Sequence, residues 1–119
     1  MGLVYADLIL KNAKFDMPNK VRARALVDTG SLFLCIPESV CEDLGITEFF
    51  KKQVRLADGS YRESKYVGPI EVNYEDKGCI VGALVMGDEV LLGAIPMEDM
   101  DIMVDPSEQR LITANQARV

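Results

Sequence analysis

The chain has 119 residues, of which 49% are hydrophobic and 27% charged, a composition that excludes a disordered segment or a coiled coil for most of its length. We expect one domain over residues 1–119, large enough to bury a core without disulfides or zinc. Nineteen acidic and thirteen basic residues give a formal charge of −6, which argues against nucleic acid as a partner, because Lys and Arg drive binding to phosphates.

Other classes are excluded by what the sequence lacks. It contains no run of about 18 apolar residues, so we expect no membrane partner. The first ten residues lack the basic start and cleavage site of a secretory signal, and the three cysteines lack CxxC spacing, so we expect a cytoplasmic protein with reduced thiols. Without histidine or a glycine-rich phosphate loop, we expect no metal and no cofactor, and carboxylates become the first candidates for acid–base chemistry.

Alternation of apolar and polar residues predicts strands at the start of the chain. Residues 20–28 place Val and Ala on one face and Lys and Arg on the other, as in a half-buried strand whose basic face meets solvent. The apolar, β-branched segment 3–11 precedes turn-forming residues 16–19, so the two strands should form a hairpin. A short buried strand is predicted over residues 32–36.

The rest of the chain predicts one short helix and more strands. Pro37 suits a first helical position and Gly45 a C-terminal cap, so a helix should lie between them. Asp58-Gly59 separates extended runs at 53–57 and 61–67 and predicts a hairpin. The remaining predictions are strands at 69–74, 79–86, 89–93, 101–105 and 110–113, with 79–86 and 89–93 buried, one helical turn at 96–100, and a tail or edge strand in the last six residues. Many short strands at this spacing favour a barrel or a sandwich.

One polar motif, Asp28-Thr29-Gly30-Ser31, directly follows an apolar strand. Taken alone, it fits a strand that ends in a polar turn, since Asp and Thr cap free N–H groups and Gly permits positive φ. About sixty residues later a second apolar strand ends in Leu91-Leu92-Gly93, and the Asp58-Gly59 hairpin lies between the two motifs.

This order of motifs resembles the retropepsin-like aspartic proteases, the family of retroviral proteases and their cellular and bacterial relatives. Those enzymes carry an apolar-apolar-Asp-Thr/Ser-Gly loop, then a β-hairpin flap, then an apolar-apolar-Gly strand that threads the loop. Residues 36–46 and 93–112 are also similar to bacterial members, so the resemblance covers nearly the whole chain. It implies an all-β closed barrel with one or two short helices, forming one lobe per chain of a homodimer.

The resemblance also implies an aspartic endopeptidase that hydrolyses peptide bonds in a peptide or protein substrate. Two carboxylates about 3 Å apart repel by roughly 5 kcal/mol at an effective dielectric near 20, so one of them keeps its proton. One then serves as base and the other as acid without any histidine. Because the chain has one Asp-Thr-Gly, a working site needs Asp28 from each chain of a symmetric dimer.

The resemblance assigns roles to individual residues. Asp28, Thr29 and Gly30 are the expected catalytic residues; Thr29 would hydrogen-bond across the dimer and Gly30 would allow close backbone approach. Ser31 is either a hydrogen-bond donor to the outer oxygen of Asp28 or an ordinary turn hydroxyl. The hairpin tip is either a mobile flap over the cleft or a plain exposed turn. The expected substrate-binding residues are Ser31, Asp58, Gly59, Ser60 and Leu92.

The sequence departs from the retroviral pattern at two positions. Leu32-Phe33-Leu34 stands where those enzymes place an acidic residue, and Ala94 where they usually carry an arginine that braces the interface. Dimer contacts would then rest on apolar surface or on the chain ends.

Two other functions remain open at this point. One is a catalytically silent dimer of the same fold that binds a peptide or protein, and the other is a monomeric barrel with a fortuitous Asp-Thr-Gly turn. Cysteines in apolar runs are typical of packing. The acidic residues between 98 and 105 lack the spacing of a calcium-binding loop and fit a solvated face.

Overall fold

The computed structural model describes residues 2–16 and 19–114, so part of the expected turn at 16–19 and nearly all of the expected tail lie outside the described residues. The chain is mostly strand (52%), with two short helices in this part, α1 (Glu38–Asp43) and α2 (Ala94–Asp99). The strands are β1 (Tyr5–Asn12), β2 (Lys20–Val27), β3 (Leu34–Ile36), β4 (Phe50–Arg55), β5 (Tyr61–Tyr74), β6 (Lys77–Val85), β7 (Leu91–Leu92), β8 (Ile102–Asp105) and β9 (Arg110–Thr113).

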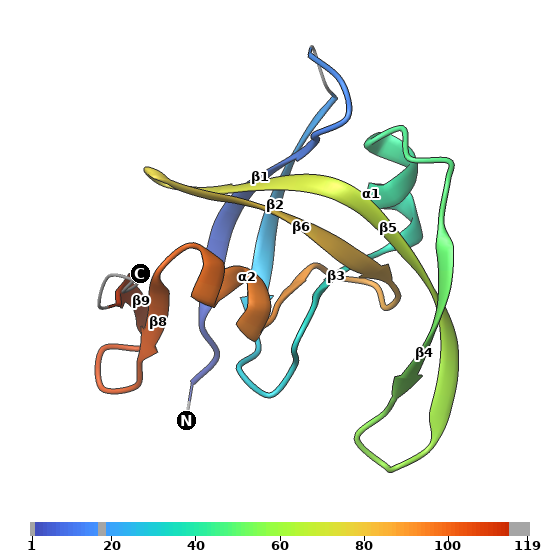
Figure 1. The fold of residues 1–119 in the computed structure, drawn as a ribbon. Helices are drawn as coiled ribbons and strands as arrows, with labels where there is room; N and C mark the ends of the chain where they lie inside the picture. The colour runs from blue at the N-terminus through green and yellow to red at the C-terminus, as the bar shows by residue number, and fades with distance from the viewer. Residues whose placement is uncertain (1, 17–18, 115–119) are drawn as a thin grey trace, which may run out of the picture.

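Six strands close into a barrel in the order β1-β2-β7-β3-β6-β5, because β5 pairs back onto β1 between residues 70–73 and 9–12. Strand β4 pairs with the far half of β5 and projects from the barrel as a hairpin (Figure 1). Strands β8 and β9 form a separate two-stranded sheet. The predicted all-β closed barrel with short helices is therefore confirmed.

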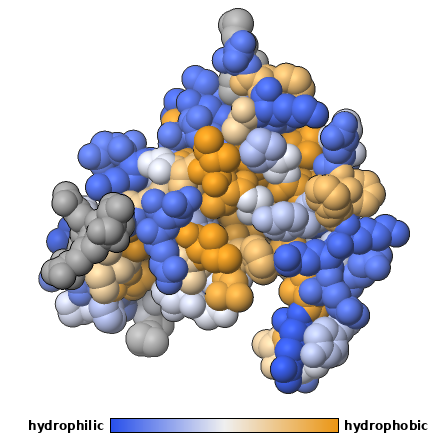
Figure 2. All heavy atoms as spheres, in the orientation of Figure 1, coloured by the Kyte–Doolittle hydropathy of each residue, from blue (hydrophilic) through white to orange (hydrophobic). Residues whose placement is uncertain are grey.

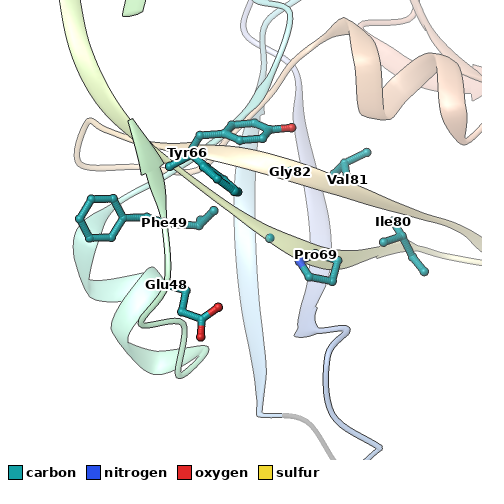
Figure 3. A pocket seen from close by; sticks show the side chains of 10 residues that line it. Glu48, Phe49, Tyr66, Pro69, Ile80, Val81 and Gly82 are labelled. Carbon is teal, nitrogen blue, oxygen red and sulfur yellow. The ribbon is translucent and has the colours of Figure 1, made fainter. Parts of the chain in front are cut away.

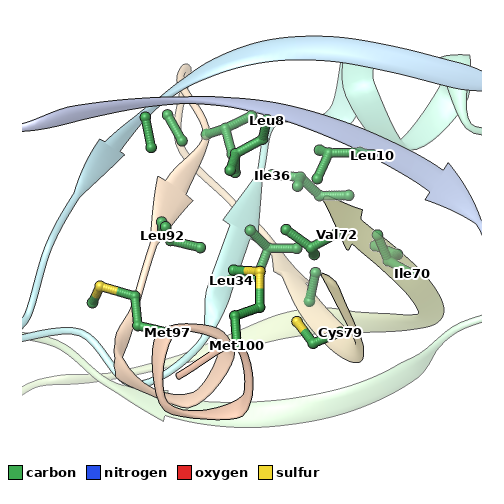
Figure 4. Close-up of a cluster of buried hydrophobic side chains, with 14 of the residues drawn as sticks. Leu8, Leu10, Leu34, Ile36, Ile70, Val72, Cys79, Leu92, Met97 and Met100 are labelled. Atoms are coloured by element: carbon green, nitrogen blue, oxygen red, sulfur yellow. The ribbon is translucent and has the colours of Figure 1, made fainter. Parts of the chain in front are cut away.

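The barrel core is built from the alternating residues that the sequence pattern indicates. In β1, Leu8 and Leu10 are buried while their neighbours are more exposed, and the basic face of β2 lies in solvent as predicted. Burying a leucine side chain fully stabilises the fold by roughly 2 kcal/mol. These side chains meet others from β3, β5, β6, β7 and α2 in one cluster (Figure 4).

Two predicted strands, 61–67 and 69–74, are in fact one bent strand, β5. Its register against β6 shifts between Val67 and Ile70, as a bulge requires. At this bend a Cβ on Gly68 would lie 3.2 Å from the Cα of Gly82, so glycine allows the two backbones to approach. The bend lets one strand serve both the barrel and the projecting hairpin.

Other predicted boundaries move by a few residues. Strand β4 begins at Phe50 rather than at residue 53, and β3 is shorter than predicted because residues 32 and 33 belong to the loop before it. The predicted helix is confirmed as α1, which follows Pro37 and ends before Gly45 at φ +71°. Neither helix in the described part of the chain is long or apolar enough to cross a membrane.

The prediction that residues 79–86 lie inside is wrong for Ile80, whose side chain is 61% exposed. Strand β6 alternates between its two faces, so Cys79 points into the core and Ile80 points out of it. A continuous apolar run therefore leaves a large hydrophobic side chain on the surface.

Candidate active site

Asp28 lies where β2 ends, at the start of a loop of residues 28–33 that we call the Asp28 loop. The Asp28 N–H donates to the Leu92 carbonyl (3.0 Å), and the N–H of Val27 donates to the Val4 carbonyl (2.8 Å). Asp28 is half-buried, and Thr29 and Gly30 are exposed. The strand end is thus held on both sides while the carboxylate reaches the surface.

The loop backbone orients the Asp28 carboxylate. The Gly30 N–H donates to Asp28 Oδ1 (3.0 Å), and the Ser31 N–H donates to the Asp28 carbonyl (3.1 Å). Burial raises the pKa of the Cys35 thiol, and a weaker opposing effect comes from the neighbouring Ser31 side chain. Among the hydrogen bonds of the described residues, the expected bond from the Ser31 hydroxyl to Asp28 is not present.

Gly93 lets a second segment cross directly beneath the Asp28 loop. A Cβ at this position would overlap the carbonyl oxygens of Phe33 and Ser31, so a larger residue does not fit without moving the backbone. The two residues after it complete the crossing: the N–H groups of Ala94 and Ile95 donate to the Ser31 and Leu32 carbonyls, each at 2.8 Å. These hydrogen bonds place the segment Leu91-Leu92-Gly93 against the Asp28 loop, as the sequence predicts.

The structure corrects the expected role of Leu92. Its side chain is fully buried in the barrel core, so it supports the Asp28 loop through its backbone carbonyl and has no surface for a substrate.

The hairpin tip is a well-defined turn of residues 56–60. Asp58 Oδ1 accepts hydrogen bonds from the N–H and the hydroxyl of Ser60, and these bonds lower the pKa of the Asp58 carboxyl. The Leu56 N–H donates to the Ser60 carbonyl (2.8 Å), and Gly59 has φ +86°, a conformation that glycine adopts without strain. The tip is exposed, and it projects from the same end of the barrel as the Asp28 loop (Figure 1).

A cluster of three side chains joins the hairpin to the Asp28 loop. The ring of Phe33, in the loop, meets that of Tyr66, in β5, edge to face with centroids 6.0 Å apart. The Lys52 ammonium, on β4, lies 5.2 Å from the Phe33 centroid and 5.1 Å from that of Tyr66. Local sequence patterns do not predict this cluster. The Asp58-Gly59 turn implies a register that puts Lys52 opposite Ser64, on the same face as Tyr66, but nothing in the sequence indicates the contact with Phe33.

A cavity of about 510 Å³ lies at the base of the hairpin (Figure 3). Asp28 is not among the residues that line it. We call it the hairpin-base cavity; its lining is formed by residues 48–50, 66–69 and 80–82.

The three cysteines are free and buried. Burial raises the pKa of the Cys79 thiol to about 11, and its thiol donates to the Pro96 carbonyl. A thiol of that kind is a poor nucleophile, so the interpretation of Cys79 as packing is consistent with its surroundings. Within residues 2–16 and 19–114, no group of three Cys, Asp or Glu side chains converges as metal ligands would.

The part of the chain that carries these features matches a known protein family. The chain matches the model of the aspartyl protease family over residues 13–115, a span that contains the Asp28 loop, the hairpin and the crossing at Gly93. The protein therefore belongs to this retropepsin-like family of aspartyl proteases. Comparison with individually curated proteins gives no match.

Proposed function

We propose that the protein is an aspartic endopeptidase whose active site is formed by Asp28 from each of two identical chains. The observation that carries this proposal is the geometry of the Asp28 loop, in which the Gly30 N–H orients an accessible carboxylate. The segment at Gly93 packs directly beneath this loop, and the chain belongs to the aspartyl protease family. A single chain supplies one such carboxylate, which is half of what acid–base hydrolysis by paired carboxylates needs.

The surface beside Asp28 supports pairing with a second copy. Thr29 and Gly30 are exposed, and next to them the side chains of Leu32 and Ile95 are 60% and 41% exposed. The Ile95 N–H donates to the Leu32 carbonyl, so these two apolar residues are neighbours. An apolar pair at the rim of the site suits burial against its own symmetry mate in an isologous interface.

The chemistry follows from placing the two carboxylates together. The ionised Asp28 takes a proton from water as the water oxygen bonds to the scissile carbonyl carbon, and the protonated Asp28 gives its proton to the carbonyl oxygen. The tetrahedral intermediate then collapses: the carbon–nitrogen bond breaks, the amine leaves with a proton from one carboxyl group, and the hydroxyl returns a proton to the other.

The hairpin is assigned the role of a flap over the bound peptide. Its tip, Asp58-Gly59-Ser60, lies at the end of two strands that extend beyond the barrel. As a flap, the tip would close over the bound peptide. The exposed backbone of the tip would bond to the backbone of an extended substrate, and apolar pockets would select side chains.

The test is digestion of a diverse peptide library by wild-type protein and by Asp28→Asn, between pH 4 and 7, read by mass spectrometry. We expect products from the wild type and a loss of at least about a thousandfold in the variant, because the variant cannot ionise at this position. Circular dichroism should show that the variant keeps the fold. Equal cleavage by both proteins, or none by the wild type at any pH, would contradict the proposal.

A further inference from the structure

The hairpin-base cavity is bordered by large hydrophobic side chains that remain in contact with solvent. Phe50 is 78% exposed and Ile80 61% exposed, and the half-exposed Phe49 lies beside them. Elsewhere the hairpin is mainly hydrophilic (Figure 2). Several exposed apolar residues around one cavity of about 510 Å³ are typical of a binding site rather than of scattered surface residues.

One aromatic side chain, Tyr66, links this cavity to the Asp28 loop. Tyr66 lines the cavity, and its ring also packs against Phe33 of the Asp28 loop. A Cβ at Gly82 would overlap the Tyr66 hydroxyl, so the glycine makes room for the ring between the loop and the cavity (Figure 3). A peptide that leaves the Asp28 loop along the hairpin would pass over Phe33 and Tyr66 and reach the cavity.

The charges along this path differ at its two ends. Lys52 lies over the Phe33 and Tyr66 rings at the end nearer the loop, and no carboxylate of the described residues forms an ion pair with it. At the other end, Glu48 lines the cavity and pairs with Lys14 (3.7 Å). The hairpin segment 49–66 carries five cationic residues and two acidic ones in a chain of net charge −6, so it is the basic part of an acidic protein.

We propose that the hairpin-base cavity is a second substrate-docking site that holds an apolar side chain lying outside the cleaved segment. An acidic side chain between this anchor and the scissile bond pairs with Lys52, while the apolar rim of the cavity, whose Glu48 is already paired with Lys14, takes the uncharged anchor. The substrate class is therefore a polypeptide with an acidic residue followed outward by a Phe- or Leu-sized residue. This inference rests on the proposed function, and a symmetric dimer would have one such site at each end of its cleft.

Matched peptides test the proposal. One peptide is a short cleavable core found in the library digest; a second adds a flexible spacer, an acidic residue and Phe; two others replace the acid by Lys or the Phe by Ser. We expect the acid–Phe extension to lower KM by about tenfold with kcat unchanged, because docking away from the reacting bond adds binding equally to the ground and transition states. The Lys and Ser versions should behave as the core does.

Substitutions on the cavity rim locate the effect. Phe50→Ser and Ile80→Glu change exposed side chains, so both proteins should fold, and both should remove the tenfold advantage of the extended peptide. Met103→Ser is the matched control, since Met103 is also exposed but lies in β8, in the separate two-stranded sheet, and does not line the cavity. Equal KM values for core and extended peptides, or an advantage that survives both rim substitutions, would overturn the proposal.

A direct binding measurement separates this inference from the proposed function. The extended peptide, labelled with a fluorophore, is titrated with Asp28→Asn protein and followed by anisotropy. Binding that requires both the acidic residue and the Phe, and that is lost in Phe50→Ser, supports the docking site. If the wild type then cleaves no peptide, that result contradicts the proposed endopeptidase activity but not the docking site. Binding that does not depend on either anchor contradicts the docking site even if cleavage is observed.

Discussion

Gly93 fixes the position of Asp28 through the backbone rather than through a side chain. The segment around it passes so close beneath the Asp28 loop that a Cβ would meet the Ser31 and Phe33 carbonyls. The same crossing supplies the hydrogen bond from the Asp28 N–H to the Leu92 carbonyl. Packing at this density tolerates no added methyl group without displacing the loop.

Gly93→Ala should therefore lower the free energy of unfolding by about 3 kcal/mol, because the new methyl group overpacks against backbone that has no room to relax. Gly78→Ala is the control. A Cβ at Gly78 would lie 3.2 Å from Oδ1 at the end of the Asn73 side chain, which is able to move, so the loss in free energy of unfolding should stay below about 1 kcal/mol. Urea denaturation measures both. Similar losses for the two variants would show that the crossing is not sterically restricted.

Cys79 should lower the free energy of unfolding as the pH becomes alkaline. Its pKa is raised by burial from an ordinary value of 9.0 to about 11, so the folded state binds the proton more tightly than the unfolded state does. The contribution is fully present below pH 9 and is lost as the pH rises through about 11. We expect the free energy of unfolding to fall by up to about 2 kcal/mol across this range, and by less in Cys79→Ala. An identical alkaline decline in both proteins would contradict this.

The hairpin differs from the strands of the closed barrel because β4 pairs on one side only, with β5. Away from the barrel, its order depends on the turn, where Asp58 accepts two hydrogen bonds from Ser60. These bonds lie in solvent and do not contribute to the core. A substitution at the tip should therefore change the conformation of the turn with little effect on the stability of the fold.

Asp58→Ala should reduce kcat/KM by about tenfold through a poorly ordered flap, while Tm changes by no more than about 2 °C. The hydrogen bonds from Ser60 lower the pKa of Asp58 below its ordinary value of 3.8, so its carboxylate is charged between pH 5 and 7 and the loss should be the same across that range. Asp76→Ala removes an equal charge from the turn between β5 and β6 and serves as control. A tenfold loss in Asp76→Ala as well would assign the effect to net charge and not to the flap.

Local signals in the sequence predict the elements better than the contacts between them. The Asp-Thr-Gly turn, the Asp58-Gly59 hairpin and the helix between Pro37 and Gly45 each depend on a few neighbouring residues, and all three elements are present. The exposure of Ile80 depends on which face of β6 packs on the core. The contact of Phe33 with Tyr66 depends on how distant segments are brought together, so no local pattern indicates it.

At the scale of the whole molecule, the described chain is one barrel with one accessible Asp28, and paired-carboxylate chemistry needs two. The apolar pair Leu32 and Ile95 lies beside that carboxylate, next to the two places, residues 32–34 and Ala94, where retroviral enzymes use an acidic residue and an arginine. In the proposed dimer these apolar side chains take the place of a charged brace, so the interface would depend on their burial and a charge at Leu32 should weaken it strongly.

The most direct test is to mix inactive chains with active ones. Asp28→Asn protein is added to a fixed amount of wild type, the chains are allowed to exchange, and peptide cleavage is measured. If each site takes Asp28 from two chains, an equal amount of the variant should lower activity to about half and a threefold excess to about a quarter, as random pairing requires. The double variant Asp28→Asn with Leu32→Lys should pair poorly and leave activity nearly unchanged. Activity that ignores any excess of the Asp28→Asn chain would contradict a site shared between two copies.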